Sequence, residues 1–539
     1  MEYSGGLNDR DSNCDGDTRG NAVGDAPRGF WAAAQADPSR IAVVDSQGRS
    51  WTAGELLAAA NQLVHGFRAR GLVEGDVVAS LSRNTPELLA LLLAIFQAGW
   101  RYVPLNTHLT ANEVAYILED SGARVLVADD AYADVAIAAA DVAELADQSR
   151  LSVGAIDGFT PLADVVAFQP STDPDHRVGG QFMQYTSGTT GRPKAVDRAL
   201  PTFSPEQWIE LFSSNMTRYD IHPGGDAVHL VTSPMYHLAP LSFGFFALNF
   251  EHTVVLMEHW DPQEALRLIE RHRVTYVQMV PTQMHRLMQL SEPVRARYDT
   301  SSLRQLTHAA APCPADLKLR LFDWLGPVIY EFYGATEGGG TMARPEEWLA
   351  HPGTVGRPWA GADVKILDDE GNELPPDTIG TVYLKLMGDF AYKGDDSKTA
   401  ANRFGDYFTV GDVGEIDEEG YLYLRDRKID MIISGGVNIY PAEVEGALLS
   451  HPAVGDAAVF GIPHEDWGEE VKAVVEPNPD YEPDPDLALE LIEHCRTSIA
   501  GYKCPRSIDF TDAMPRDPNG KLYKRTLRDP YWIGRERSV

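Results

Sequence analysis

The chain has 539 residues, of which 44% are hydrophobic and 9% aromatic, and its charged side chains sum to a formal net charge of −33. A chain of this length is too long for one hydrophobic core, so two to four domains are expected. The large negative charge argues against nucleic acid or an anionic membrane as the main partner. It also requires that any anionic ligand be held by local positive groups.

The N-terminal segment and the cysteines further narrow the class of protein that is expected. Residues 1–28 are polar, rich in Gly and Asp, and lack the apolar core of a signal peptide, so a disordered lead is expected there. The longest apolar helical run, Leu88 to Phe96, is far shorter than a membrane span. Neither metal spacing nor a disulfide framework connects the four cysteines, which are Cys14, Cys313, Cys495 and Cys504. We therefore expect a cytoplasmic protein with reduced thiols and no integral membrane segment, and the possibility of a homodimer stays open.

Short β-branched runs alternate with amphipathic segments of helical length through most of the chain. The first block predicts strands at Val77–Leu81, Tyr102–Val103 and Arg124–Val127, with helices at Pro86–Ala98 and Ala111–Asp120. The second predicts helices at Pro262–His272, Pro281–Leu290 and Ala315–Leu325 among strands at Ala227–Thr232, Thr253–Met257, Thr275–Val280, Leu303–His308 and Val328–Phe332. Strands separated by such helices form mostly parallel sheets covered on both faces, so an α/β domain of two packed sheets is predicted.

The pattern changes after about residue 354. Apolar and polar residues alternate from Val364 to Ile366 and again from Val382 to Leu386, on either side of a turn, which predicts a small antiparallel, barrel-like subdomain at about 354–424. The charged run Arg425–Lys428 marks a boundary. Beyond it, strands near Ala457–Phe460 and Val471–Val475 and a helix near Leu487–Ile499 predict a small, mobile α+β domain at 427–539.

The segment Tyr185–Lys194 carries two glycines, hydroxyl residues and a lysine directly after an apolar run. Small residues leave backbone N–H groups open to a ligand, and the lysine supplies a movable positive charge, a combination that suits a triphosphate. It is not a Walker A loop, because Gly188 and Gly191 are too close and Ala195 follows the lysine. A flexible surface loop is the alternative reading. The candidate nucleotide-binding residues here are Thr186, Ser187, Gly188, Thr189, Thr190, Gly191 and Lys194.

This segment resembles the phosphate loop of the adenylate-forming superfamily, which includes acyl- and aryl-CoA ligases, luciferases and peptide-synthetase adenylation domains. Four further segments resemble motifs of that family in family order: Tyr333–Glu337 for adenine and magnesium, Tyr407–Asp412 for ribose, Arg427–Pro441 for the hinge and hairpin, and Pro515–Lys521 for the C-terminal lysine. The match spans roughly residues 30 to 530 and implies an adenylate-forming domain at 29–426. It further implies an acid–CoA ligase that uses ATP and Mg²⁺ to form an acyl-adenylate with release of pyrophosphate, and then a CoA thioester.

The resemblance also implies residue roles for the first half-reaction. Glu337 and Thr189 would hold Mg²⁺, Thr336 would touch the α-phosphate, and Lys521 would bridge the substrate carboxylate and the α-phosphate. Such electrostatic stabilisation suits a reaction in which two anions must approach. Further nucleotide contacts are implied for Tyr333, Gly334, Ala335, Ala310, Ala311, Asp412 and Arg427.

For the second half-reaction, the resemblance implies that the C-terminal domain rotates. It would then present Ser434, Gly435 and Gly436 to the pantetheine arm of CoA, where glycines allow close passage. The family usually carries Asp or Lys at the hinge position, two residues after the arginine, and Ile429 stands there instead.

The run Ser233–Pro240 resembles the acyl-pocket motif of CoA ligases. His237 would line the pocket as a catalytic residue, and the other candidate pocket residues are Tyr236, Ala309 and Gly334. No acidic residue in this run could bind an α-amine, so an amino-acid substrate is not expected. Asp197 is close in sequence to the phosphate loop, and we favour the reading in which it turns away or pairs with Arg198. The alternative is that it acts as a base for an incoming nucleophile.

Two alternatives remain open at this point. One is an adenylating enzyme that uses an amine as acceptor in place of CoA, and the other is a catalytically silent nucleotide-binding protein on the same fold. The sequence does not separate fatty, aryl and polycyclic acids as substrates.

Overall fold

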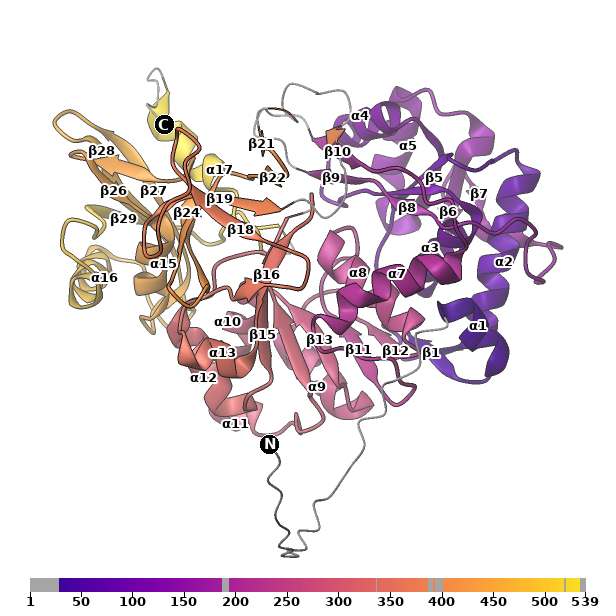
Figure 1. Ribbon diagram of the computed structural model, residues 1–539, viewed down its shortest axis with the longest axis horizontal. Coiled ribbons are helices and arrows are strands. Elements are labelled where there is room, and N and C mark those ends of the chain that lie inside the picture. The colour runs from indigo at the N-terminus through magenta and orange to yellow at the C-terminus, as the bar shows by residue number, and fades with distance from the viewer. Residues whose placement is uncertain are drawn as a thin grey trace, which may run out of the picture.

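The computed structural model describes residues 29–186, 193–335, 337–385, 391–392, 400, 402–517 and 520–533. Its larger part is built on two sheets with helices between and outside them (Figure 1). One sheet has six parallel strands in the order β7 (Thr160–Pro161), β6 (Arg150–Val153), β5 (Ala123–Asp129), β3 (Val77–Leu81), β4 (Arg101–Pro104) and β8 (Gln181–Phe182).

The second sheet has nine strands, parallel in the middle and antiparallel towards both edges. Their order is β17 (Arg357–Pro358), β16 (Gly340–Ala343), β15 (Ile329–Gly334), β14 (Gln305–His308), β13 (Tyr276–Met279), β11 (Val228–Val231), β12 (Thr253–Leu256), β1 (Ile41–Val44) and β2 (Ser50–Thr52). The two packed, mostly parallel sheets confirm the predicted α/β class, and the predicted elements differ from the observed ones by no more than four residues at either end.

The helices form three layers around these sheets. The core between the sheets takes side chains from α1 (Gly29–Ala36), α2 (Ala53–Ala69), α3 (Pro86–Ala98), α7 (Pro205–Thr217) and α8 (Leu238–Asn249). The outer face of the six-stranded sheet is covered by α4 (Ala111–Ser121) and α5 (Ala133–Val142). The outer face of the nine-stranded sheet is covered by α9 (Pro262–His272), α10 (Pro281–Gln289), α12 (Ala315–Leu325) and α13 (Pro345–Ala350). Short helices α6 (Leu162–Val166) and α11 (Glu292–Arg295) and 3₁₀ turns η1 (Asp130–Tyr132) and η2 (Asp147–Ser149) complete this part.

Helix α3 shows how local sequence and tertiary position agree. The Thr85 hydroxyl accepts the Leu88 N–H at 3.2 Å, Pro86 occupies the first turn, and Gly99 ends the helix with φ 73°. A helix that is apolar on every side is stable only inside a core or a bilayer, and α3 lies between the two sheets. In the described parts of the chain, no helix combines the length and the apolarity needed to cross a membrane.

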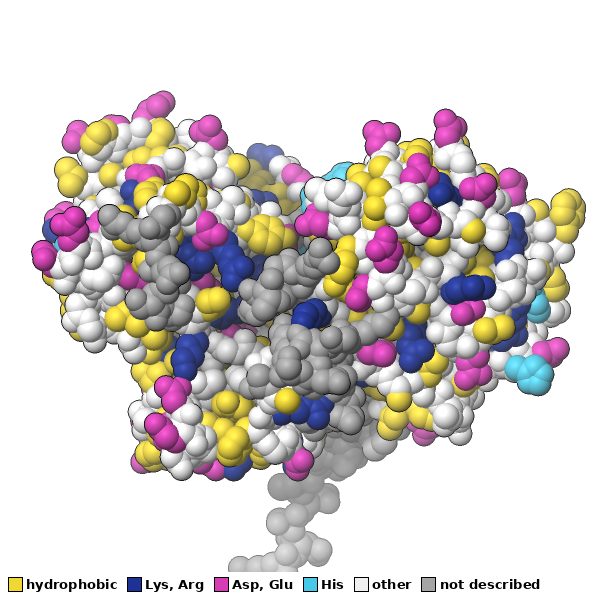
Figure 2. Space-filling model, turned by 90° about the horizontal axis from the view of Figure 1, so that it is seen from above, with side chains coloured by type: hydrophobic (Ala, Val, Ile, Leu, Met, Phe, Trp, Pro, Cys, Tyr) yellow, Lys and Arg dark blue, Asp and Glu magenta, His cyan; other side chains and the backbone are white. Residues whose placement is uncertain are grey.

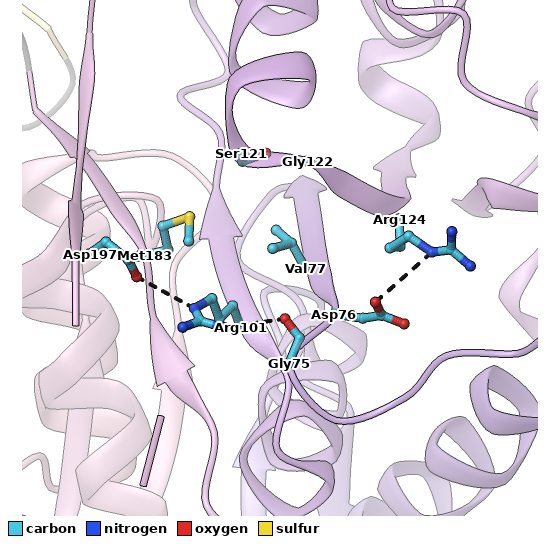
Figure 3. A pocket seen from close by; sticks show the side chains of 9 residues that line it. All are labelled: Gly75, Asp76, Val77, Arg101, Ser121, Gly122, Arg124, Met183 and Asp197. Atoms are coloured by element: carbon cyan, nitrogen blue, oxygen red, sulfur yellow. Dashed lines mark hydrogen bonds and ion pairs between the residues drawn. The ribbon is translucent and has the colours of Figure 1, made fainter. Parts of the chain in front are cut away.

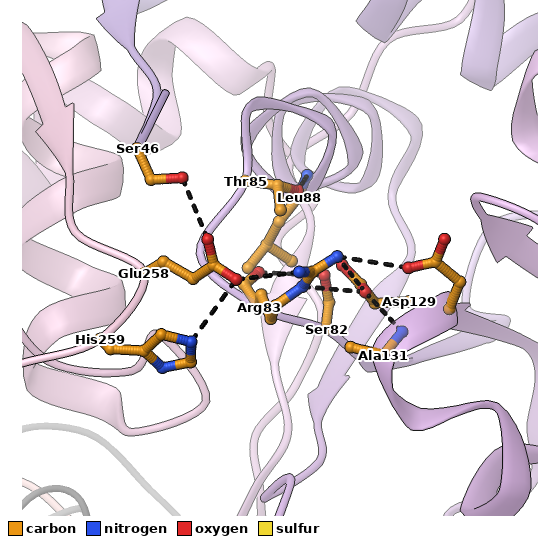
Figure 4. A network of polar contacts seen from close by, with 10 residues as sticks. Ser46, Ser82, Arg83, Thr85, Leu88, Asp129, Ala131, Glu258 and His259 are labelled. Atoms are coloured by element: carbon orange, nitrogen blue, oxygen red, sulfur yellow. Dashed lines mark hydrogen bonds and ion pairs between the residues drawn. The ribbon is translucent and has the colours of Figure 1, made fainter. Parts of the chain in front are cut away.

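An arginine-centred network joins the carboxyl ends of the two sheets (Figure 4). The Arg83 guanidinium follows β3 and donates to Asp129 Oδ1 at 3.0 Å, Asp130 Oδ1 at 3.3 Å and Glu258 Oε1 at 2.9 Å. The first two acids belong to the six-stranded sheet side, whereas Glu258 follows β12 of the other sheet. Hydrogen bonds to these carboxylates raise the pKa of Arg83, so the guanidinium stays protonated. Its ion pairs therefore link one sheet to the other.

The subdomain after residue 354 is an open antiparallel sheet. Its strands run in the order β21 (Arg403–Phe404), β22 (Tyr407–Phe408), β19 (Gly380–Lys385), β23 (Asp412–Ile416) and β24 (Leu422–Arg427), and β18 (Val364–Leu367) pairs with β19. A smaller sheet contains β20 (Ala391–Tyr392), β10 (Lys194–Asp197) and β9 (Gln184–Thr186). The predicted barrel is therefore wrong for the described strands, because β24 does not pair back to β18. Alternation predicts the strands but does not specify which edges meet.

The C-terminal domain has its own sheet and core (Figure 1, orange to yellow). The sheet holds β26 (Val437–Ile439), β25 (Ile432–Ser434), β28 (Gly468–Pro477), β27 (Val454–His464) and β29 (Ser507–Phe510), packed with α15 (Pro441–Leu449) and α16 (Pro485–Ser498). The chain continues through α17 (Lys524–Arg528) and η3 (Asp529–Trp532). This domain touches α10, where the Gln289 side chain donates to Asn478 Oδ1 at 2.8 Å.

Candidate active site

The adenine and ribose candidates meet at the edge between the nine-stranded sheet and the antiparallel subdomain. Asp412 and Arg427 face each other across β23 and β24, and the Arg427 Nε lies 3.5 Å from Asp412 Oδ1. The Tyr333 hydroxyl, near the end of β15, donates to Asp412 Oδ2 at 2.6 Å. Burial and the Asp412 carboxylate raise the pKa of Tyr333, so the phenol stays protonated. Two predicted residues, Tyr333 and Arg427, thus come from different sheets to contact the carboxylate of a third, Asp412.

The phosphate loop is anchored at both ends. Thr186 ends β9 and Lys194 begins β10, and these two residues are direct antiparallel partners, so the two ends of the predicted loop lie side by side. The remaining predicted loop residues and Thr336 lie outside the described residues, namely Ser187, Gly188, Thr189, Thr190 and Gly191.

Glu337 is a buried carboxylate near Arg198, with 6% of its surface exposed. Burial lowers the pKa of Arg198, and the nearby negative charge of Glu337 opposes that shift. Among the described residues, no cluster of three or more Asp, Glu, His or Cys side chains forms a complete metal cage. A single buried carboxylate such as Glu337 fits Mg²⁺, which is commonly held by one or two carboxylates together with substrate phosphates.

Asp197 does not pair with Arg198. Its Oδ1 lies 3.4 Å from Arg101 Nε, in a surface pocket that Arg101 shares with Gly75 and Ser121 (Figure 3). Successive side chains of a strand point to opposite faces, and at the end of β10 this turns Asp197 towards the six-stranded sheet. Of the two favoured possibilities, the one in which Asp197 turns away is borne out by this geometry, and the one in which it pairs with Arg198 is wrong. The alternative role as a base gains no support.

The acyl-pocket motif bends directly into helix α8. His237 occupies the N-cap position, and the centroid of its ring lies 4.4 Å from that of the Tyr236 ring. The backbone carbonyl of Tyr236 accepts a hydrogen bond from the Gln184 side chain at 2.9 Å. Burial lowers the pKa of His237 to about 3, with further lowering by the positive charges of Lys521 and His108. His237 is therefore neutral at physiological pH.

The Lys521 hairpin of the C-terminal domain reaches this same place. The Lys521 N–H donates to Asp517 Oδ1 at 2.9 Å, and Asp517 Oδ2 lies 4.0 Å from His237 Nε2. Gly520 has φ 76°, and a Cβ there would lie 2.8 Å from Thr282 Oγ1 at the start of α10. Desolvation at this junction, followed by the charge of Arg427, lowers the pKa of Lys521. The lysine thus lies between the His237 side and the Asp412 side of the site.

The Ser434–Gly436 hairpin is partly exposed at the surface of the C-terminal domain. It joins β25 to β26, Gly435 and Gly436 have φ of 58° and 79°, and both glycines are exposed. The Gly435 N–H donates to the Trp467 carbonyl at 2.9 Å, within the same domain. Ile429, at the hinge position, lies in the turn that follows β24.

The alanine segment follows β14, one of whose neighbours in the sheet is β15. Ala309 is buried, Ala311 is half-buried, and Ala310 is exposed with φ 77°, a left-handed conformation that favours glycine. Gly334 ends β15 and is exposed, and Ala335 packs partly against the antiparallel subdomain.

Sequence reasoning missed the residues that hold the lysine hairpin. Arg516 donates to Asp456 at 2.5 and 2.7 Å and to the Gly520 carbonyl at 2.6 Å. No local pattern identifies Asp456, which is separated from Arg516 by 60 positions along the chain. Sequence reasoning treats Arg198 only as a possible partner of Asp197 and does not predict its position near Glu337.

Figure 2 shows how charge is distributed on one face. Many of the visible Lys and Arg side chains lie towards the middle of the face, whereas acidic side chains are frequent around its margins. The strong overall negative charge therefore coexists with positive side chains gathered on this face.

Two protein-family models match this chain. One described as "AMP-binding enzyme" matches residues 30–391, and one described as "AMP-binding enzyme C-terminal domain" matches residues 443–521. The chain belongs to this family of adenylate-forming enzymes, in the branch that contains the acyl- and aryl-CoA ligases.

Three relatives illustrate the likeness. The chain is 36% identical to feruloyl-CoA synthase of an Amycolatopsis species, over 93% of this chain and 98% of the relative. It is 34% identical to the fatty acid–[acyl-carrier-protein] ligase ScoC of Streptomyces coeruleorubidus, over 94% and 96%. Among solved structures, the o-succinylbenzoate CoA synthetase MenE of Bacillus subtilis in complex with its acyl-adenylate intermediate superposes with a TM-score of 0.78. That match has 28% identity and covers 95% of this chain and 99% of that one.

Proposed function

We propose that this protein is an ATP-dependent acid–CoA ligase that forms an acyl-adenylate and then a thioester. The observation that carries the proposal is the meeting of Lys521 from the C-terminal domain with His237 and the Asp412–Arg427 pair. A carboxylate and a nucleotide would share a positively charged junction there, and the buried neutral His237 would not compete for the incoming anion.

In the first half-reaction the carboxylate attacks the α-phosphorus and pyrophosphate leaves. Asp412 would accept hydrogen bonds from the ribose hydroxyls, as carboxylates do in other nucleotide folds. Lys521 would bridge the carboxylate and the α-phosphate, and Thr336 would donate to that phosphate. Glu337, with Thr189, would hold Mg²⁺, which neutralises charge on the triphosphate when bound. The tight turn at Gly520 holds the Lys521 backbone against α10.

For the second half-reaction we propose that the C-terminal domain rotates about the turn at Ile429. Rotation would withdraw Lys521 and bring Ser434, Gly435 and Gly436 towards the acyl-adenylate. A Cβ on Gly436 would meet no atom within 4 Å, so its surroundings are open to a thin thiol arm. The thiolate would attack the acyl carbon, the bond to AMP would break, and AMP would leave.

The test is a pyrophosphate-release screen with acids of different size, run with and without CoA and with free amines. The relatives act on fatty, feruloyl and succinylbenzoyl acids, so the panel contains one of each class. A thioester that requires CoA supports the proposal. Amide formation from amines without CoA would instead support the amine-accepting alternative, and absence of pyrophosphate with every acid would refute catalysis.

A further inference from the structure

Four aromatic rings form a box beside the predicted acyl pocket. We define the aromatic box as Tyr219, Phe243, Phe332 and Trp359. Tyr219 lies 5.4 Å from Phe243, 5.1 Å from Phe332 and 6.3 Å from Trp359, measured between ring centroids, and Phe243 lies 6.0 Å from Phe332. The rings come from the turn after α7, from α8, from β15 and from the segment after β17, so only the tertiary fold brings them together.

The aromatic box directly adjoins Gly334. On β15, Phe332 and Gly334 point to the same face because side chains alternate along a strand, and they lie about 7 Å apart. A Cβ on Gly334 would be 3.5 Å from Trp359 Cη2, and one on Gly340 would be 2.4 Å from the same atom. The indole therefore fills the space that these two glycines leave. In the proposed ligase, an acid seated over Gly334 would meet this aromatic wall.

Arg218 stacks on the same indole. Its guanidinium lies 5.3 Å from the Trp359 ring centroid, and the side chain is half-buried. Burial lowers the pKa of Arg218, and no Asp or Glu of the described residues forms an ion pair with it. The neighbouring carboxylate, Asp220, is instead bound by Arg344 at 2.8 and 3.2 Å.

Arg218 has no carboxylate partner among the described residues, although the chain has 79 Asp and Glu against 46 Lys and Arg. Its guanidinium offers five N–H donors. The Arg218 nitrogens are not among the buried side-chain atoms that lack a partner, so they reach solvent. An acceptor on a ligand could take the place of water at these donors.

We propose that Arg218 and the aromatic box select a compact aromatic acid that carries an acceptor oxygen on the ring, far from the reacting carboxyl group. This inference rests on the proposed ligase function. The Trp359 indole lies next to both the Arg218 guanidinium and the Gly334 backbone, so a substrate about one ring long that packs along the indole would span them. The box supplies aromatic packing, and Arg218 donates to the distal oxygen.

The test measures pyrophosphate release with benzoate and cinnamate, with their 4-hydroxy and 4-carboxy derivatives, and with straight-chain acids of eight and twelve carbons. The wild type is expected to favour the oxygen-bearing acids over their unsubstituted parents by about 10-fold or more in kcat/KM. Arg218→Met is expected to lower kcat/KM for the oxygen-bearing acids by about 10- to 100-fold, as for loss of a hydrogen bond to a charged group. It should leave the unsubstituted acids within about 3-fold.

The matched control is Arg49→Met, which also removes a guanidinium stacked on an indole, at 4.8 Å from the Trp51 ring, outside the proposed site. Arg49→Met should leave the preference for oxygen-bearing acids over their unsubstituted parents unchanged. If Arg218→Met does not fold, Arg218→Lys keeps the charge and should retain part of the preference. Equal loss for all acids, or a wild type that prefers unsubstituted or straight-chain acids, would overturn the inference while leaving the ligase function standing. Absence of pyrophosphate with every acid would overturn both.

Discussion

Replacing Arg516 should separate the two half-reactions of the proposed enzyme. The Arg516 guanidinium donates twice to Asp456, whose side chain is 9% exposed, and once to the Gly520 carbonyl directly before Lys521. Arg516→Met keeps the aliphatic stem but removes all three hydrogen bonds. We expect Lys521 to lose its position at the junction with His237, because the hairpin is then held by Asp517 without the Gly520 clamp.

The magnitude follows from the contacts. A hydrogen bond from a charged donor contributes about 1.5–3 kcal/mol, so loss of the Gly520 contact should slow adenylation by about 10- to 100-fold. Breaking a buried ion pair leaves Asp456 unpaired and costs about 3–5 kcal/mol of stability. The double variant Arg516→Met/Asp456→Asn removes that unpaired charge, so it should recover most of the stability but not the adenylation rate.

Two assays read this out. Pyrophosphate release reports adenylation, and thioester formation from supplied acyl-AMP reports the second step, with urea unfolding as the stability measure. The second step should stay near the wild-type rate in both variants, because Lys521 is not used there. The reasoning would be refuted if the double variant adenylated at the wild-type rate, or if both half-reactions fell together.

Three other predictions use different parts of the molecule. Lys521→Ala should slow adenylation by on the order of 10²–10³ and spare thioester formation from acyl-AMP; equal loss in both assays would contradict the divided roles. Burial lowers the pKa of His229 to about 3, so the unfolded chain takes up this proton first as the pH falls below about 6.5. His229 should therefore remove about 1.4 kcal/mol of stability per pH unit below that point, and His229→Phe should show a shallower fall in melting temperature between pH 7 and 5; an unchanged slope would exclude this histidine. Ala310→Gly should raise stability by about 1 kcal/mol in urea unfolding because φ at this exposed position is 77°, and a lower midpoint would show that the alanine is not strained.

Most of the secondary structure was predictable from local pattern. Helix α3 needs only its apolar run, Thr85, Pro86 and Gly99, all of which lie within 15 positions of one another. The phosphate-loop, ribose and lysine motifs are also contiguous, so resemblance located Asp412, Arg427 and Lys521 before any contact was known. The structure then brought these three residues close to Tyr333 and His237.

The remaining features depend on which elements lie side by side. The partner of Asp197 is Arg101, from another sheet, and the antiparallel strands form an open sheet where alternation suggested a barrel. Arg218, Trp359 and the other rings of the aromatic box come from four separate segments. Local sequence determines backbone periodicity because each hydrogen-bonded turn or strand involves near neighbours. Long-range pairing is decided only when burial of the apolar faces selects one packing of sheets and helices, and that choice placed the arginines of this protein.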